Sequence, residues 1–346
     1  MIQYLKKIIR SYINKKRSNI DKSIKFNSSI LNKNNLKYII KNFGNKNKDK
    51  VFYVIQRFRG GGMFSNLNFV LHHIFIAQKL GFIPIVDMKN FPTKYNEKNK
   101  INNSSNAWDY YFYPLNKYTL EEVYKSRRVI FTDGQTRKLN EFDTFANLNE
   151  KHYRIYKKMI KFKPFLINYV NSFIKKNFGK KKFLGVHFRG TDMKTQERHP
   201  FPATTDQIIS IIEKELKNNK YTKIFVVTEE LKYFDILSKK FGNIIYFSDS
   251  FRSNKNNIFE QSFRKNHRFN IGKENIIDML ILSKSDKIIC TNSHLPDASK
   301  FINYGKKMKF IEINNGFNSS NLLIAQYLWY VKKILPESLG GFKKFL

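Results

Sequence analysis

From residue 182 to residue 334, short apolar runs alternate with amphipathic stretches, and this alternation constrains the fold more than any other feature of the sequence. Short apolar runs between polar segments are typical of strands buried on both faces of a sheet. Strands that alternate with helices predict consecutive βαβ units, and therefore an α/β fold with a doubly wound parallel sheet. We expect strands at 182–188, 223–228, 244–248, 287–291 and 309–313, and helices at 205–218, 230–241, 274–284, 295–303 and 321–334.

A shorter unit of the same kind lies nearer the N-terminus. An apolar strand is expected at 51–56, a glycine-rich turn follows, and a helical pattern runs over 67–80 before a second strand at 82–86. Gly60, Gly61 and Gly62 in that turn match neither the dinucleotide fingerprint nor the Walker loop. They are compatible with a cradle for a phosphate or a sugar at a helix N-terminus, and equally with a plain tight turn.

Arg189 directly follows the expected strand at 182–188. In open α/β sheets, ligands bind at the carboxyl ends of the strands. The planar, permanently charged guanidinium suits a phosphate. Asp192 lies three residues further on, so a structural ion pair at the strand end is the alternative interpretation.

A second group of polar residues surrounds the strand expected at 287–291. Asp278 lies on a mostly apolar helix before that strand, where its carboxylate faces either solvent or a ligand. Thr291 ends the strand, and Ser293 precedes the next helix. Ser293 and the free N–H groups of that helix could hold a phosphate, although a serine at this position is often a simple N-cap.

The segment 89–150 is irregular and rich in aromatic residues, among them Trp108 and Tyr111. A long irregular segment in a compact domain is usually functional or an insertion. Aromatic rings can stack on sugar rings, so both residues are candidates for binding an acceptor. A subsidiary hydrophobic core has the same composition and is the alternative.

The net charge of +37 indicates an anionic partner, such as a nucleic acid, a phosphorylated substrate or an acidic membrane surface. The lysines are scattered along the whole chain, and Lys, Asn, Ile and Phe are all favoured by AT-rich codons. The sequence has none of the common RNA-binding or zinc-finger patterns, which argues against a nucleic-acid partner. It also contains no Asp-x-Asp, which argues against the metal-dependent GT-A transferases.

Residues 1–25 place apolar side chains at helical spacing, with lysines and arginines elsewhere around the helix. Such a helix can lie on an anionic bilayer or pack on the protein itself. Cys290 is the single cysteine, so no disulfide forms within the chain and a reducing compartment is expected. No apolar run is long enough to span a membrane, and no secretory signal is recognisable. We therefore expect a cytoplasmic protein, peripheral on the inner face of the membrane.

Three motifs together resemble those of the fucosyltransferase superfamily, which includes nodulation, core α1,6- and protein O-fucosyltransferases. The stretch 187–192, His-Phe-Arg-Gly-Thr-Asp, resembles the His-x-Arg-Arg-Thr-Asp motif of that superfamily. Asp278-x7-Asp286-x4-Thr291-x-Ser293 resembles the later motif, and the triple glycine resembles the N-terminal donor loop. The chain departs from the family at three positions: Gly190 replaces the second arginine, Met193 a lysine and His294 a serine.

The resemblance implies a glycosyltransferase with a GT-B-like fold, in which two Rossmann-like domains flank a central cleft. It implies an inverting, metal-independent transfer from GDP-fucose to a glycan, with no cofactor. By the resemblance, Arg189 holds the β-phosphate, His187 and Asp278 recognise guanine, and Thr291, Ser293, Gly61 and Gly62 lie near the diphosphate. Glu197 stands where some members place a general base, and a surface charge is the alternative. We expect the acceptor to be a glycan, lipid-linked in surface polysaccharide synthesis; another nucleotide-sugar transferase, or a nucleic-acid-binding protein, is the competing hypothesis.

The expected organisation has five parts. They are a basic amphipathic helix over 1–25, a linker over 26–50, an N-terminal acceptor-side domain over 51–175, a C-terminal GDP-sugar-binding domain over 176–320, and a C-terminal helix and tail over 321–346. The length of 346 residues is sufficient for two domains of ordinary size.

Overall fold

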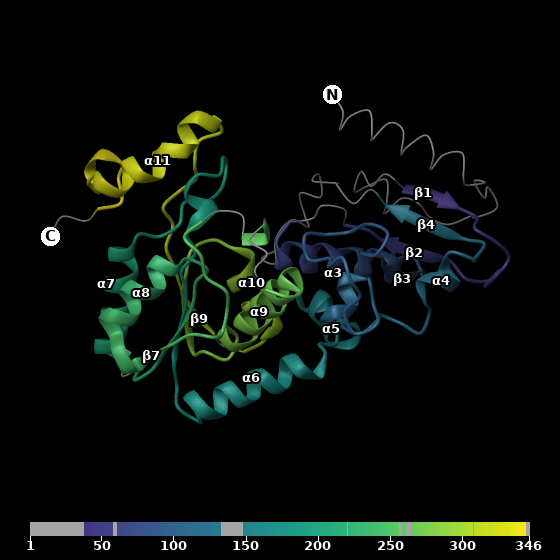
Figure 1. Ribbon diagram of the computed structural model, residues 1–346, viewed down its shortest axis with the longest axis horizontal. Helices are drawn as coiled ribbons and strands as arrows, with labels where there is room; N and C mark the ends of the chain where they lie inside the picture. The colour runs from purple at the N-terminus through teal and green to yellow at the C-terminus, as the bar shows by residue number, and fades with distance from the viewer. Residues whose placement is uncertain are drawn as a thin grey trace. The chain divides into compact units, whose positions relative to one another are not determined.

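The computed structural model describes residues 38–57, 61–132, 148–219, 221–255, 258–260, 264–306 and 308–343. The chain divides into two compact units, Met1–Lys163 and Pro164–Leu346 (Figure 1). The expected helix over 1–25 and Gly60 lie outside the described residues. The central cleft stays a prediction.

The first unit contains a four-stranded sheet in the order β1-β4-β2-β3. β2 (Phe52–Ile55), β3 (Ile83–Val86) and β4 (Val129–Thr132) are parallel, and α3 (Met63–Lys79) connects β2 to β3. The βαβ unit expected from the sequence is therefore confirmed. All four residues of β2 are buried, as its apolar composition predicts.

The expected linker over 26–50 is wrong in its described part, because Tyr38–Lys41 form strand β1. β1 pairs antiparallel with β4, with Ile39 opposite Phe131. The short apolar run at 38–40 is enough for an edge strand once β4 supplies the hydrogen-bonding partner. Phe43 then packs against the core under the sheet.

Short helices complete the first unit. They are η1 (Ala107–Tyr110), α4 (Leu120–Val123) and α5 (Glu150–Met159). α4 begins with a capping box in which Thr119 and Glu122 satisfy each other's backbone N–H groups, and Asn149 and His152 do the same for α5.

The second unit contains a fully parallel five-stranded sheet in the order β7-β6-β5-β8-β9. The strands are β5 (Leu184–His187), β6 (Ile224–Val227), β7 (Ile245–Tyr246), β8 (Lys287–Cys290) and β9 (Lys309–Glu312). From β5 the chain builds outward through β6 to β7, and then returns to add β8 and β9 on the other side of β5. This order confirms the doubly wound sheet and places its topological switch point between β5 and β8.

Helices cover both faces of this sheet (Figure 1). α7 (Thr205–Asn219) and α8 (Leu231–Phe241) pack on the face that carries Leu184 and Val186. α9 (His267–Leu282) covers the other face, where a Cβ on Gly185 would lie 2.7 Å from Leu282 Cδ1. α6 (Pro164–Asn177) and α10 (His294–Ile302) pack against α9.

The position of α6 corrects the expected domain boundary between 175 and 176. α6 belongs to the second unit, because Phe173 contacts the ring of Phe225 on β6 with the centroids 5.7 Å apart. α9 also begins earlier than the expected residue 274, after Asn266 in the left-handed conformation. The remaining elements are η3 (Thr191–Lys194), η4 (Gly242–Ile244), η5 (Ile258–Glu260), α11 (Leu322–Ile334) and η6 (Glu337–Leu339). Among the described helices, none has the length and apolar character needed to cross a membrane.

Candidate functional site

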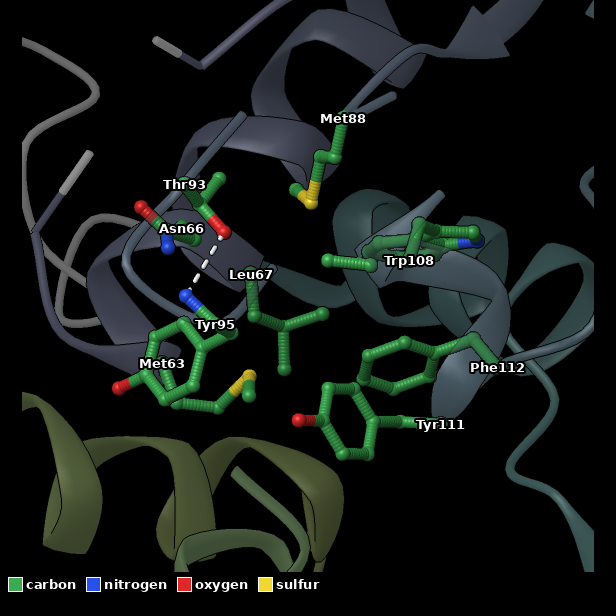
Figure 2. A pocket seen from close by; sticks show the side chains of 10 residues that line it. Met63, Asn66, Leu67, Met88, Thr93, Tyr95, Trp108, Tyr111 and Phe112 are labelled. Atoms are coloured by element: carbon green, nitrogen blue, oxygen red, sulfur yellow. Dashed lines mark hydrogen bonds between the residues drawn. The ribbon is translucent and has the colours of Figure 1, made fainter. Parts of the chain in front are cut away.

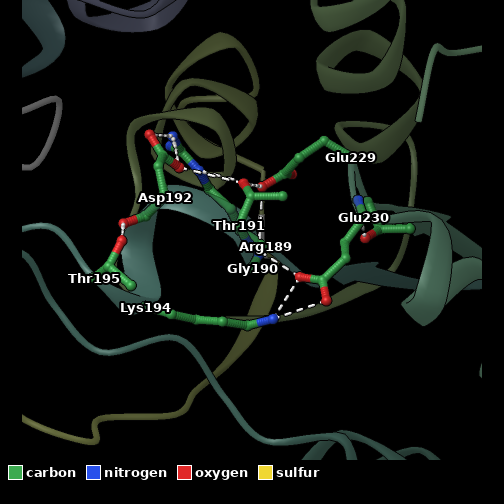
Figure 3. A network of polar contacts seen from close by, with 9 residues as sticks. Arg189, Gly190, Thr191, Asp192, Lys194, Thr195, Glu229 and Glu230 are labelled. Atoms are coloured by element: carbon green, nitrogen blue, oxygen red, sulfur yellow. Dashed lines mark hydrogen bonds and ion pairs between the residues drawn. The ribbon is translucent and has the colours of Figure 1, made fainter. Parts of the chain in front are cut away.

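Arg189 lies where the chain leaves β5, at the carboxyl edge of the sheet (Figure 3). Its Nη2 is 3.3 Å from Asp192 Oδ1, and its Nε is 3.6 Å from Glu229 Oε1. The side chain of Arg189 nevertheless keeps 35% of its surface exposed. The ion pair considered from the sequence is therefore present, and part of the Arg189 side chain remains accessible.

Glu229 and Glu230, which follow β6, hold the backbone after Arg189. Glu229 Oε1 accepts hydrogen bonds from Gly190 N–H at 3.3 Å and from Thr191 Oγ1 at 3.1 Å. Glu230 Oε2 accepts one from Thr191 N–H at 3.0 Å. Burial raises the pKa of Glu229, and the charge of Arg189 opposes that rise. These carboxylates were not predicted from the sequence, although two consecutive acids directly after an expected strand were a usable signal.

Lys194 forms a buried ion pair with Glu230. Its Nζ lies 2.8 Å from one carboxylate oxygen of Glu230 and 2.6 Å from the other. The ammonium group also lies over the rings of Tyr233 and Trp329, at 4.6 and 5.1 Å from their centroids. Burial lowers the pKa of Lys194, and Glu230 opposes that effect.

This ion pair explains the glycine at position 190. A Cβ on Gly190 would lie 1.9 Å from Glu230 Oε2 and 2.7 Å from the ring of Tyr233. No side chain fits there while Glu230 occupies this position.

His187 and Thr291 bring two buried polar atoms to the switch point. His187 ends β5, and Thr291 follows β8, with exposed fractions of 3% and 2%. His187 Nδ1 and Thr291 Oγ1 have no hydrogen-bond partner among the described residues. Burial, with the nearby charge of Arg189, lowers the pKa of His187 to about 3, so the ring is neutral. Unsatisfied buried polar groups are rare, and at this edge of a sheet they indicate a ligand or ordered water.

Ser293 stands at the N-cap position of α10, also at the switch point. It is 9% exposed, and its side chain makes no capping hydrogen bond to the helix. The simple capping role considered from the sequence is therefore not the one that its hydroxyl has in this structure. A serine hydroxyl and N–H groups at a helix N-terminus are of the type that binds an anion, although Asp297 in the first turn of α10 adds a negative charge there.

Asp278 lies on α9 and is 5% exposed. Its carboxylate accepts hydrogen bonds from the hydroxyl groups of Ser248 and Ser250, the latter at 3.0 Å. Burial raises the pKa of Asp278 to about 7, although both serines and Arg252 oppose the rise. Ser248, Ser250 and Arg252 follow β7, so this group also lies at the carboxyl edge of the sheet, and the sequence analysis missed all three.

Arg252 orders the loop that carries the two serines. Its Nη1 and Nη2 each donate at 2.9 Å to the carbonyl oxygens of Ser250 and Ser248. The guanidinium lies over the rings of Phe234 and Phe247, at 4.8 and 5.2 Å from their centroids. The loop that carries the serines around Asp278 is therefore held by a planar cation that is itself stacked on two rings.

Glu197 lies on an exposed turn after η3. The next residue, Arg198, has a φ of +58°, and its N–H donates to Ser319 O at 3.1 Å. The turn is thereby fixed against the segment that precedes α11. A general base and a surface charge both remain compatible with this position of Glu197.

In the first unit, Gly61 and Gly62 lead into α3, with Gly62 at the N-cap position. Arg57, directly after β2, reaches the same turn: its Nε donates to Asn66 Oδ1 at 3.3 Å and its Nη2 to Ser65 Oγ at 3.2 Å. The N-terminal turn of α3 therefore carries a guanidinium as well as free N–H groups. The sequence analysis did not single out Arg57, although its place after a strand is the same as that of Arg189.

Trp108 and Tyr111 belong to the core of the first unit, which does not favour the expected role of their rings in stacking on an acceptor, although Trp108 also lines the larger cavity described below. They are 3% and 1% exposed, and Trp108 stacks on Phe112 with the centroids 4.2 Å apart. Both line a cavity of about 10 Å³ (Figure 2), which has room for about one water molecule. Covered ring faces cannot stack on a sugar, so the subsidiary core is the interpretation that the structure supports.

A larger cavity, of about 310 Å³, lies along β3 at the edge of the first sheet. Residues of β3 and of the segment 103–120 line it, together with Lys89 and Lys100. Asp109 faces it and accepts a hydrogen bond from Ser104 Oγ at 3.0 Å. Burial raises the pKa of Asp109. The cavity has the size of a small-molecule site and presents polar groups of both signs.

Within the described ranges, no group of three or more His, Cys, Asp or Glu side chains is placed to hold a metal ion.

No family model and no curated protein sequence matches the chain. Solved structures do match it. NodZ α1,6-fucosyltransferase co-crystallised with GDP is 17% identical, with 77% of this chain and 96% of that chain covered and a TM-score of 0.51. NodZ from Bradyrhizobium gives 17% identity, coverage of 79% and 100%, and a TM-score of 0.49. POFUT1 in complex with GDP gives 12% identity, coverage of 76% and 73%, and a TM-score of 0.35. The first of these matches shows that the chain has a fucosyltransferase-like fold, as the motifs predicted.

Proposed function

We propose that this protein is a glycosyltransferase that moves fucose from GDP-fucose to a glycan. The observation that carries the proposal is the convergence at the switch point of the second sheet. There, the accessible part of Arg189, the N-terminus of α10 and the unpartnered atoms of His187 and Thr291 lie at the ends of adjacent strands. The shared fold with NodZ, which was co-crystallised with GDP, supports the choice of a guanine nucleotide.

In the proposed reaction, Arg189 binds the β-phosphate of the donor. Glycosyl transfer leaves GDP with an additional negative charge, and a fixed guanidinium with helix N–H groups stabilises that charge where it develops. Ser293 and Thr291 add hydroxyl donors at the same edge of the sheet. The acceptor hydroxyl attacks the anomeric carbon in a single inverting displacement, and a carboxylate such as Glu197 takes its proton.

The guanine base is assigned to Asp278, with His187. A carboxylate can accept the N–H and the amino group that guanine presents side by side. Ser248 and Ser250 already hold the Asp278 carboxylate by hydrogen bonds, so its orientation is set before the base arrives. Uracil presents no such pair of donors, and GDP is therefore expected to bind in preference to UDP.

Fucose is the donor sugar that we place first, and another GDP-sugar is the alternative. The alternative is favoured by one observation: Glu230 fills the space beside Gly190, where the family has an arginine. A carboxylate accepts hydrogen bonds from sugar hydroxyls, whereas an arginine donates hydrogen bonds to them. The preferred pattern of hydroxyl groups on the donor sugar is therefore expected to differ. A panel of GDP-sugars decides between them.

We place the glycan acceptor in the cavity of about 310 Å³ in the first unit, whose lining includes Trp108 but not Tyr111. Asp109 and Ser104 can hydrogen-bond sugar hydroxyls there, and Lys89 and Lys100 suit acidic groups on the acceptor. We also propose that the glycan is a lipid-linked precursor of a surface polysaccharide, made at the cytoplasmic face of the membrane. The basic amphipathic pattern of residues 1–25 supports this location.

The test is isothermal titration of the full-length chain with GDP and with UDP at physiological salt. GDP is expected to bind, UDP to bind at least tenfold more weakly, and Arg189→Ala to weaken GDP binding at least tenfold. Arg154→Ala, which changes an exposed arginine on α5, is the matched control and is expected to leave GDP affinity unchanged. Equal affinity for the two nucleotides, or full GDP affinity in Arg189→Ala, would contradict the proposal. Mass spectrometry of nucleotide release from GDP-fucose, GDP-mannose and GDP-heptose then identifies the donor.

A further inference from the structure

Helix α11 carries an exposed apolar face that the rest of the second unit does not cover. Seven of its thirteen residues are large apolar side chains that are about half exposed or more: Leu322, Leu323, Ile324, Tyr327, Tyr330, Val331 and Ile334. The most exposed are Leu323 at 71% and Ile334 at 72%. Contiguous exposed apolar surface of this kind usually marks an interaction site.

The exposed side chains form one stripe. Leu323, Tyr327, Tyr330 and Ile334 recur at spacings of four, three and four residues, so they share one side of the helix, and Ile324 and Val331 flank them. Ala325 and Trp329 lie on the opposite side and are buried. We call the stripe and its two flanking residues the α11 face. The helix thus has two apolar sides, of which the narrow one is used to attach it to the unit.

Hydrogen bonds fix α11 to the rest of the second unit, so its outer side has a defined position on the protein surface. Trp329 Nε1 donates to Pro202 O at 3.0 Å, and Asn318 Nδ2 donates to Ala325 O at 2.9 Å and to Gln196 O at 3.2 Å. These bonds tie α11 to the loop that follows η3 and the Arg189 motif. The outer side is therefore presented in a fixed orientation, and Figure 1 shows α11 at the periphery of the second unit.

We propose that the α11 face inserts into the interfacial region of an anionic lipid bilayer. The positive charge of the chain is the reason for choosing an anionic bilayer over a second copy of the protein. Residues 316–336 contain no aspartate or glutamate. Lys333 borders the apolar stripe, whereas Lys332 lies on the attached side, with its Nζ over the rings of Phe201 and Phe342. The whole chain carries a net charge of +37, so an anionic surface attracts it and a second copy of the same chain repels it. Tyr327 and Tyr330 combine an apolar ring with a polar hydroxyl, as side chains at a membrane interface do.

A helix–helix interface with a second copy is the main competitor, because the spacing of the stripe would also suit a coiled-coil seam. Such seams are normally flanked by charged residues that pair between the helices. Here Ile324 and Val331 widen the apolar surface along one border of the stripe, and Gln326 and Lys333 lie along the other. The width of the apolar surface and the like charge of the partners therefore favour the bilayer. This inference stands independently of the proposed transferase activity.

The first test is flotation of the full-length protein with vesicles of phosphatidylcholine alone and of phosphatidylcholine with 30% phosphatidylglycerol. Binding to the anionic vesicles is expected to be at least tenfold stronger, because each basic residue near the bilayer contributes about fivefold and the chain carries a net charge of +37. Leu323→Ser with Ile334→Ser is expected to weaken that binding at least tenfold without changing the melting temperature. Leu231→Ser, an exposed leucine on α8 that is 40% accessible, is the matched control.

A local probe separates α11 from any other membrane-binding segment of the chain. Tyr327→Cys, labelled with an environment-sensitive nitrobenzoxadiazole dye, is expected to shift to the blue on anionic vesicles and to be quenched by spin-labelled lipids. Lys158→Cys on α5 is the labelled control; the native Cys290 is buried. Failure to bind the vesicles, or binding without a change at position 327, would overturn the proposal. A lipid-free dimer, seen by sedimentation and dissociated by Leu323→Ser with Ile334→Ser, would overturn it in favour of a second copy.

Discussion

Replacing Asp278 by asparagine is expected to stabilise the second unit, and to do so more as the pH rises. Burial raises the pKa of Asp278 from 3.8 to about 7. The folded chain therefore holds a proton on this carboxyl group over a range in which the unfolded chain has lost it. Stability consequently falls as the pH rises from about 4 to about 7, which is the reverse of the usual behaviour of a paired aspartate.

The magnitude follows from the shift. One pKa unit corresponds to about 1.4 kcal/mol, so the raised pKa of Asp278 costs roughly 4 kcal/mol of stability at pH 8, where the group is ionised, and roughly 1.5 kcal/mol at pH 5, where the folded chain must keep its proton. Asparagine carries no charge at either pH, and Ser248 and Ser250 can accept hydrogen bonds from its amide. The free energy of unfolding that Asp278→Asn gains over the wild type should therefore grow by about 3 kcal/mol between pH 5 and pH 8. Any packing cost of the amide is the same at both pH values and cancels.

The assay is urea unfolding of the wild type and of Asp278→Asn at pH 5 and pH 8, followed by tryptophan fluorescence. Trp329 reports on the second unit, and a Trp108→Phe background removes the signal of the first unit. Asp249→Asn, which changes an exposed neighbour, is the control and should alter stability little at either pH. A difference between Asp278→Asn and wild type that stays constant or shrinks from pH 5 to pH 8 would refute the reasoning.

The same carboxylate gives GDP binding its own pH dependence. Only the ionised form of Asp278 can accept both donors of guanine, so GDP affinity is expected to rise up to about pH 7 and to level off above it. Below pH 7 the loss approaches tenfold for each pH unit. Titrations between pH 5.5 and pH 8.5 measure the profile, and a profile that is unchanged in Asp278→Asn would show that another group causes it. If Asp278 binds guanine as proposed, Asp278→Asn is expected to be more stable than the wild type and to bind GDP more weakly. Such a trade-off between stability and function is common at binding sites.

Three further substitutions address the loop around Arg189. Gly190→Ala is expected to destabilise the second unit by about 1–3 kcal/mol, because the new methyl group collides with Glu230; an unchanged urea midpoint would show that Glu230 can move away. Lys194→Met is expected to cost about 3–5 kcal/mol because it leaves Glu230 buried and unpaired, and Lys194→Met with Glu230→Gln should recover much of that loss in the same urea titration. Glu229→Gln is expected to strengthen GDP binding several-fold in calorimetry, since it removes a carboxylate that competes for Arg189, and weaker binding would assign Glu229 a direct contact with the donor.

The sheet of the second unit could be predicted from the sequence because its strands are apolar on both faces. β5, β6 and β8 are almost entirely buried, so their composition alone distinguishes them from the amphipathic helices between them. β1 could not be predicted in the same way. It is an edge strand with exposed and half-buried side chains, and only its pairing with β4 makes it a strand.

Most of the candidate site residues predicted from the sequence lie at the ends of strands or helices, and Asp278 was predicted because a carboxylate is unusual on a mostly apolar helix. Arg189 and Thr291 were identified by their position at the end of a strand, whereas Glu229 and Arg57, which also follow strands, were not. Aromatic composition was a poor guide, because Trp108 and Tyr111 have the same residue types in a core as in a sugar site. What decides between the two is whether neighbouring side chains cover the rings, and long-range packing of that kind leaves no mark on the local sequence.

The candidate donor site does not share the strongly positive net charge of the whole chain, which is +37. Five acidic residues gather at this edge of the second unit: Asp192, Glu229, Glu230, Glu274 and Asp278. The cations that pair with them are Arg189, Lys194, Arg252 and Arg264, so the local charge is close to zero. A diphosphate bound there would be held by one guanidinium and by directed N–H and O–H groups at short range, which salt screens weakly. The excess of lysine on the rest of the chain acts at longer range, on an extended anionic surface, and its effect must fall steeply with salt. The two kinds of binding are therefore separable by ionic strength alone.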